Sequence, residues 1–124
     1  MKHLLDVNVL IAGVWKTHSR HAQAQSWLRA GELFVCPITE LGFLRISSHP
    51  KAIGADMDAA REALGRFAAH WKVGRIPDDL PALASHPKKS GQVTDHYLAD
   101  LAGRHGLKLA TFDADLKHPS AVLI

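Results

Sequence analysis

The fold is decided by the segment His3-Leu4-Leu5-Asp6-Val7-Asn8-Val9-Leu10-Ile11-Ala12-Gly13, close to the start of this 124-residue chain. Residues 3–7 are mostly apolar and predict a short buried strand that ends in the carboxylate of Asp6. Residues 8–13 predict a short helix, with Asn8 near its N-terminal cap. A buried strand that passes directly into a helix is typical of a parallel sheet covered by helices.

The rest of the chain repeats this alternation. Short apolar runs predict strands at residues 33–36, 107–112 and 121–124, with a short strand or an extended link at 75–77. Helices are predicted at residues 19–30, 39–46, 56–71 and 94–102, the last capped by Thr94, and a polar, basic loop at 85–91. No internal repeat or low-complexity segment divides the chain. We therefore expect one α/β/α domain over residues 1–124, with a mainly parallel central sheet.

The composition is that of an ordinary globular domain. The chain is 47% apolar and 22% charged, which excludes disordered, collagen-like and coiled-coil proteins. Its single cysteine, Cys36, excludes an internal disulfide and a cysteine-based zinc site. Every apolar stretch is too short to span a membrane, and Asp6 and Asn8 interrupt what would be the apolar region of a secretion signal. We therefore expect a cytoplasmic protein with no membrane contact.

Four well-separated carboxylates interrupt apolar surroundings: Asp6, Glu40, Asp95 and Asp113. Asp6 and Asp113 follow predicted strands, whereas Glu40 and Asp95 lie in the first turns of helices. Because sites in parallel sheets form beyond the carboxyl ends of the strands, all four can converge on one rim. Two carboxylates about 4 Å apart repel by about 4 kcal/mol at an effective dielectric constant near 20. Such a group must bind a divalent metal, take up protons or move apart, and oxygen ligands favour Mg²⁺ or Mn²⁺ over zinc.

Each acid also has a purely structural interpretation. Asp6 could cap the helix that follows it, although its apolar neighbours make an unpartnered carboxylate costly there. Glu40 and Asp95 could be first-turn acids that interact with a helix dipole, and Asp113 could be a turn residue.

Other polar residues could support such a site. Asn8 could contribute its amide oxygen instead of capping a helix, and Thr111 shares a strand face with Asp113, where it could orient a carboxylate or a water molecule. We interpret Asp100 and Asp115 as exposed or auxiliary acids. The nine histidines lack the close spacing of a metal-ligand motif, so we expect none of them to bind metal.

The basic residues are in mild excess. Fifteen Lys and Arg against twelve Asp and Glu give a net charge of +3, which by itself does not predict nucleic-acid binding. The candidate contacts to a phosphate backbone are Lys88 and Lys89 in the basic loop, and Arg45, which lies five residues after Glu40. Structural pairing with an acid is an equally good interpretation of Arg45.

Four segments together resemble the PIN-domain family, and more narrowly the VapC-type toxins of bacterial toxin–antitoxin modules: LLDVNVL (4–10), TELGFLR (39–45), TDHYLA (94–99) and ATFDAD (110–115). Each motif is weak alone, but their order and spacing match that family over essentially the whole chain. The resemblance implies a PIN-like fold and a Mg²⁺- or Mn²⁺-dependent endoribonuclease. Such an enzyme hydrolyses RNA through a metal-activated water and leaves 5′-phosphate and 3′-hydroxyl ends.

The resemblance also assigns roles. It places metal binding and catalysis on the four acids, with Asn8 and Thr111 in support, and it implies a small cognate antitoxin and a homodimer. Two other functions stay open. One is a non-catalytic module that binds RNA or a partner. The other is a phosphohydrolase with Asp6 as nucleophile, although its usual second acid would stand where this chain has Asn8.

Overall fold

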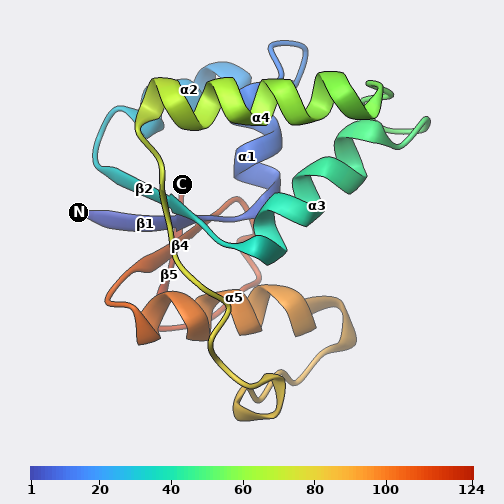
Figure 1. The fold of residues 1–124 in the computed structure, drawn as a ribbon. Coiled ribbons are helices and arrows are strands. Elements are labelled where there is room, and N and C mark those ends of the chain that lie inside the picture. Colours follow the sequence, from blue (N-terminus) through green and yellow to red (C-terminus); the bar gives the residue numbers. More distant parts are fainter.

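Five parallel strands form the centre of the computed structural model, which describes residues 1–124 (Figure 1). The strands are β1 (Lys2–Leu5), β2 (Glu32–Val35), β3 (Gly74–Arg75), β4 (Lys108–Thr111) and β5 (Ala121–Leu123). They lie in the order β3-β2-β1-β4-β5, and every neighbouring pair is parallel. The α/β fold and the parallel sheet expected from the sequence are confirmed.

Helices cover both faces of this sheet. Four lie on one side, namely α1 (Val7–Val14), α2 (His21–Leu28), α3 (Pro37–Ser48) and α4 (Met57–Trp71), and α5 (Val93–Arg104) lies on the other (Figure 1). Two short 3₁₀ turns, η1 (Ala82–Ala84) and η2 (Ser90–Gln92), precede α5. None of these helices is both long and apolar enough to cross a membrane.

Adjacent residues of β1 supply the cores on the two faces. Leu5 packs with Val9 and Phe43 beneath the four-helix layer, while Leu4 packs with Leu98 beneath α5. Successive side chains of a strand point to opposite faces, so a strand covered on both sides must be apolar at every position. This explains why β1 carries two consecutive apolar residues, Leu4 and Leu5, one for each face of the sheet.

The sheet order places a ligand site at the end of β1. In the sheet, β2 and β3 lie on one side of β1, and β4 and β5 lie on the other side. Ligands of open parallel sheets bind beyond the carboxyl ends of the strands where the order reverses in this way. Asp6 follows β1 at once and Asp113 follows β4 by two residues, so both acids lie at this point.

Four helices begin differently from the prediction, and one of them, α2, starts at His21 rather than at residue 19. The first turn of α1 starts at Val7 with Asp6 as its cap, and α5 starts at Val93, directly after η2. The caps predicted at Asn8 and Thr94 are therefore wrong, since both residues lie inside their helices. The start of α3 is at Pro37, where the hydroxyl of Thr39 accepts a hydrogen bond from the Cys36 N–H at 3.1 Å.

Candidate active site

Asp6 is a buried carboxylate with both oxygens in use. It is 3% exposed. Its Oδ1 accepts the Val7 N–H at 2.8 Å, and its Oδ2 accepts the Thr111 hydroxyl at 2.8 Å. Burial raises the pKa of Asp6 above its ordinary value, and the Asp113 charge adds to this rise, although the two hydrogen bonds oppose it. One carboxylate oxygen of Asp6 therefore caps α1, and the same side chain also lines the candidate site.

Thr111 connects the ends of β1 and β4. Its side chain is 1% exposed, donates to Asp6 and accepts the Asp113 N–H at 3.0 Å. Asp113 in turn accepts the Asp115 N–H through Oδ1 at 2.9 Å. The arrangement makes Thr111 an orienting residue for a carboxylate, one of the two roles that its strand face suggested.

Asp95 lies in the first turn of α5, as expected, and is half-buried. Burial and the charges of Asp6 and Asp113 raise the pKa of Asp95 to about 6. The three aspartates therefore repel one another across the sheet edge. Carboxylates at close range are costly in free energy when no cation lies between them.

Glu40 stands apart from this group. It lies in the first turn of α3, as predicted, but its Oε2 is 3.4 Å from Nε of Arg75 on the edge strand β3. The α3 residues at the site include Ile38, Leu41 and Arg45, which lie on one face of the helix. Glu40 is about 100° around the helix from Leu41 at 3.6 residues per turn, so its side chain leaves the helix in another direction.

A groove of about 430 Å³ lies between α1, α3 and α5. Its polar lining includes Asp6, Asp95, Asn8 and Arg45, and its apolar lining includes Ile38, Leu41 and Ile46. The guanidinium of Arg45 makes no ion pair, so pairing with an acid does not account for it. The groove thus joins an acidic floor to one free cation, an arrangement suited to a metal ion and a phosphate group.

Close packing fixes one wall of this groove. A Cβ atom at Gly42 would lie 2.7 Å from Cγ2 of Val7, so glycine lets α3 approach the first turn of α1. Val7 directly follows Asp6, and the contact therefore sets the width of the groove beside that carboxylate.

Lys88 and Lys89 lie outside the groove. They line a separate polar pocket together with His96 and His118. These two histidines and Asp100 form a cluster whose nitrogen and oxygen atoms lie within 4.8 Å of one another. Sequence reasoning missed the cluster: His96 and Asp100 are four residues apart on α5, but His118 comes from a distant loop that no local spacing indicates.

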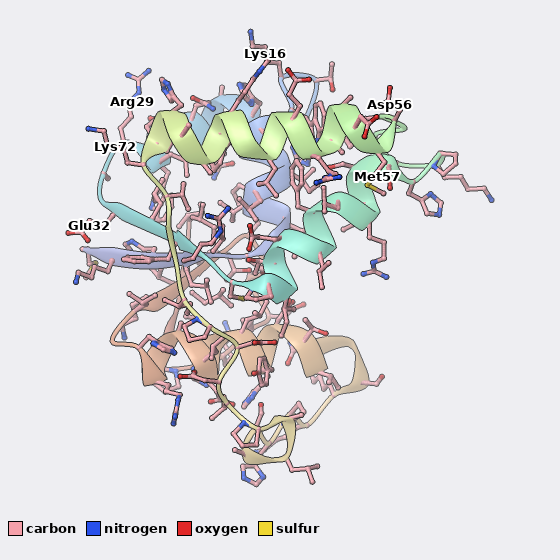
Figure 2. The ribbon with its side chains drawn as sticks, viewed as in Figure 1. Lys16, Arg29, Glu32, Asp56, Met57 and Lys72 are labelled. Carbon is pink, nitrogen blue, oxygen red and sulfur yellow. The ribbon has the colours of Figure 1, made fainter.

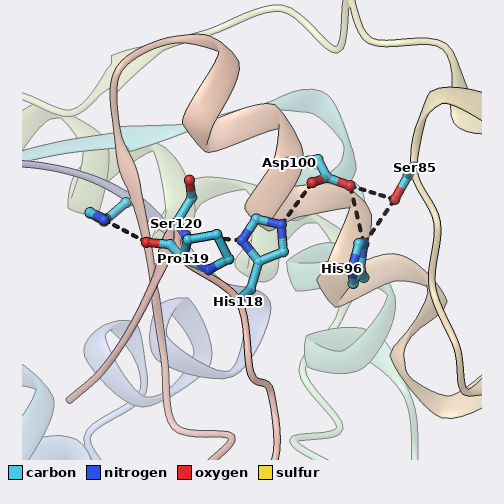
Figure 3. A network of polar contacts seen from close by, with 7 residues as sticks. Ser85, His96, Asp100, His118, Pro119 and Ser120 are labelled. Carbon is cyan, nitrogen blue, oxygen red and sulfur yellow. Dashed lines mark hydrogen bonds and ion pairs between the residues drawn. The ribbon is translucent and has the colours of Figure 1, made fainter.

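The cluster is a closed hydrogen-bond network rather than an open ligand set (Figure 3). Asp100 accepts from Ser85 Oγ at 2.7 Å and from His118 Nε2 at 2.7 Å, and His96 Nδ1 lies 3.1 Å from both Ser85 Oγ and Asp100 Oδ2. The Nδ1 of His118 accepts the Ser120 N–H at 2.9 Å, which assigns the ring proton to Nε2. A metal at Nε2 would displace that proton and set Nδ1–H against the Ser120 N–H, so the geometry favours a structural role.

Comparison with known proteins gives a consistent result. The sequence profile of the PIN domain matches residues 3–121. The chain is 40% identical over 123 residues to Ribonuclease VapC38 of Mycobacterium tuberculosis strain H37Rv, covering 90% of this chain and 84% of that protein. It is 38% identical over 128 residues to Ribonuclease VapC39 of the same species, covering 94% of this chain and 91% of that protein.

A solved structure has the same fold. The crystal structure of VapBC2 from Rickettsia felis bound to a DNA fragment from their promoter superimposes with a TM-score of 0.66. The match covers 100% of this chain and 98% of that one at 14% identity.

Proposed function

This chain belongs to the PIN-domain family, in its VapC branch, and from that premise we propose that it is an endoribonuclease, the toxin of a toxin–antitoxin module. The single observation that carries the proposal is the groove, which Asp6, Asp95 and Arg45 line together. The charge of Asp113 raises the pKa of both Asp6 and Asp95. Its relatives in Mycobacterium tuberculosis bear the name ribonuclease.

A divalent cation fits these residues. Burial and mutual repulsion raise the pKa values of Asp6 and Asp95, and a cation among the carboxylates would relieve that repulsion. All donors are oxygens, which suits Mg²⁺ or Mn²⁺. We propose that Asp6, Asp95 and Asp113 hold the ion, with Asn8 in support and Glu40 as a fourth acid when it leaves Arg75. A bound ion would activate water and neutralise the charge that develops on the phosphodiester.

The chain's own residues position the reactants. Thr111 fixes the carboxylate plane of Asp6 through its hydroxyl, so the acid keeps one orientation. Arg45 offers a forked guanidinium at the rim of the groove, where it can bind a phosphate of the RNA through two parallel hydrogen bonds. We propose that Lys88 and Lys89 contact the RNA backbone outside the groove.

An aspartate nucleophile fits the site poorly. Asp6 is 3% exposed and each of its oxygens accepts a hydrogen bond, which lowers its reactivity toward phosphorus and its access to a substrate. A non-catalytic binding module is disfavoured on energetic grounds, because binding alone would not require three mutually repelling carboxylates at one edge.

The proposal includes a cognate antitoxin as partner. Leu41 is 65% exposed beside Ile38 and Ile46, and this apolar wall would be covered by a partner that blocks the groove. We also propose a single PIN domain over residues 1–124, a cytoplasmic location where RNA is available, and a homodimer. The mass of the purified chain in solution tests the homodimer.

Cleavage of a structured RNA pool tests the function. Purified protein with Mg²⁺ or Mn²⁺ should produce fragments with 5′-phosphate ends, and neither EDTA-treated protein nor Asp6→Asn should do so. Trapping of a phosphoryl group on Asp6 would instead support the phosphohydrolase.

A further inference from the structure

The first turn of α5 separates the acidic groove from a second pocket. Thr94 and Asp95 line the groove, whereas Gln92 and His96 line a pocket of about 450 Å³ on the other side. The chain after β4 also touches both sites, because Asp113 belongs to the acidic group and Asp115 accepts a hydrogen bond from Gln92 through its carbonyl oxygen at 3.2 Å. The two sites are therefore neighbours with a common wall.

This second pocket is rich in cations, and we call it the basic pocket. Its basic lining residues are His86, Lys88, Lys89, His96, Lys117 and His118. Asp115 is the only acid in its lining, and none of its lining residues is an apolar side chain apart from Pro119. The three lysines are exposed at its mouth. Such a surface attracts an anion and offers nothing to an apolar helix.

The base of the basic pocket is held rigidly. The His96 and His118 rings meet edge to face with centroids 4.9 Å apart, and Asp100 binds both of them (Figure 3). Ser85 adds a hydrogen bond to Asp100, which ties the loop before η2 to α5. The loop that carries Lys88 and Lys89 is therefore anchored to α5 at Ser85.

We infer that the basic pocket is a phosphate subsite for the RNA strand next to the cleavage groove. This inference rests on the proposed nuclease function and extends it by locating where the strand continues beyond the scissile bond. Three lysines around a polar hollow suit a polyanion, since each ammonium can contact a different phosphate without reading a base. The subsite should thus strengthen RNA binding without adding sequence preference.

The salt dependence of RNA binding tests the inference. For single strands, the logarithm of the association constant falls with the logarithm of salt concentration with a slope of about −0.7 per phosphate contact. A fluorescent oligouridine is titrated with the chain in EDTA, which separates binding from cleavage. The pocket variant combines Lys88→Gln, Lys89→Gln and Lys117→Gln. We expect its slope to be shallower than that of the unaltered chain by about 1 to 2.

A matched control removes the same charge elsewhere. It combines Lys16→Gln, Lys51→Gln and Lys72→Gln, three exposed lysines away from α5; Lys16 and Lys72 lie beside α4, on the opposite side of the sheet (Figure 2). We expect the control to keep the slope of the unaltered chain. Equal slopes in the pocket and control variants, whether both lowered or both unchanged, would overturn the inference.

Cleavage measured separately keeps the two claims distinct. If the metal-loaded chain cleaves RNA but the pocket and control variants share one slope, only the subsite is wrong. If the chain never cleaves RNA but the pocket variant alone loses slope, the subsite holds and the nuclease proposal fails.

Discussion

The hydroxyl of Thr111 donates a 2.8 Å hydrogen bond to Oδ2 of Asp6, across a sequence separation of 105 residues. This bond joins the ends of β1 and β4 at the point where the strand order reverses. It also holds a buried carboxylate in one orientation, since the other oxygen is fixed by the Val7 N–H. The geometry of the acidic site therefore depends on a neutral side chain.

Thr111→Val should weaken both the fold and the site. The buried hydroxyl has two partners, so its loss should lower the free energy of unfolding by about 1 to 3 kcal/mol. The pKa of Asp6 should rise further, because the hydrogen bond from Thr111 lowers it. Urea unfolding measures the change in stability, and Mn²⁺ titration measures the weakening of the site as a loss of Mn²⁺ affinity. The exposed Thr17→Val is the control for both measurements. Unchanged Mn²⁺ affinity would contradict the orienting role.

Cleavage should depend on the ionisation of Asp95. Burial and its acidic neighbours raise the pKa of this carboxyl to about 6, so it is protonated and a poor metal ligand in mildly acidic solution. At limiting Mg²⁺ the rate should fall as the pH drops through about 6, and excess Mg²⁺ should move the fall to lower pH, because the ion competes with the proton. A rate that is independent of pH over this range would contradict the assignment.

The metal-free chain should lose stability as the pH rises through the same range. The folded-state pKa of Asp95, about 6, lies above the ordinary value of 3.8 for an aspartate, so its stabilising contribution is full below pH 3.8 and disappears as the pH rises through about 6. Asp95→Asn should therefore be more stable than the unaltered chain at pH 7 in EDTA, by about 1 kcal/mol after allowance for solvent screening.

Urea unfolding at several pH values measures this effect. The control is Asp58→Asn, an exposed acid in the first turn of α4, which should show no such gain. Mn²⁺ should stabilise the unaltered chain and the control but not Asp95→Asn. An Asp95→Asn variant that is less stable than the unaltered chain at pH 7 would show that this carboxylate is not strained by its neighbours.

The ion pair between Glu40 and Arg75 should compete with metal binding. If Glu40 serves as a fourth acid, Arg75→Gln frees its carboxylate and should tighten Mn²⁺ binding several-fold, whereas Glu40→Gln should weaken it. Neither change should affect stability much, since Arg75 is largely exposed and such pairs contribute about 0–1 kcal/mol. Isothermal titration in Mn²⁺ decides the point. Identical affinities in both variants would remove Glu40 from the metal site.

The main features of the site could be predicted because they follow from strand ends. Asp6 and Asp113 follow the carboxyl ends of the parallel strands β1 and β4. A parallel sheet places the carboxyl ends of its strands at one edge, so these two acids could be located from the strand pattern alone. Asp95 and Glu40 were likewise placed correctly in the first turns of their helices.

The remaining features depend on side-chain partners that are distant in sequence. Glu40 pairs with Arg75, and His118 meets Asp100 through a loop; neither contact has a local pattern. The predicted cap of α1 was wrong for a related reason. Asp6 can be both cap and site residue because a carboxylate has two oxygens, and the sequence does not show how they are divided.

The central claim is that the aspartate groove cleaves RNA with the help of a divalent ion. Its most direct test is the incubation of an RNA pool with purified chain in Mn²⁺, with end analysis of the products, beside EDTA and Asp6→Asn controls. We predict fragments with 5′-phosphate ends that require both the ion and Asp6. Fragments of the same yield from Asp6→Asn, or no fragments from the folded, Mn²⁺-loaded chain free of any partner, would contradict the claim.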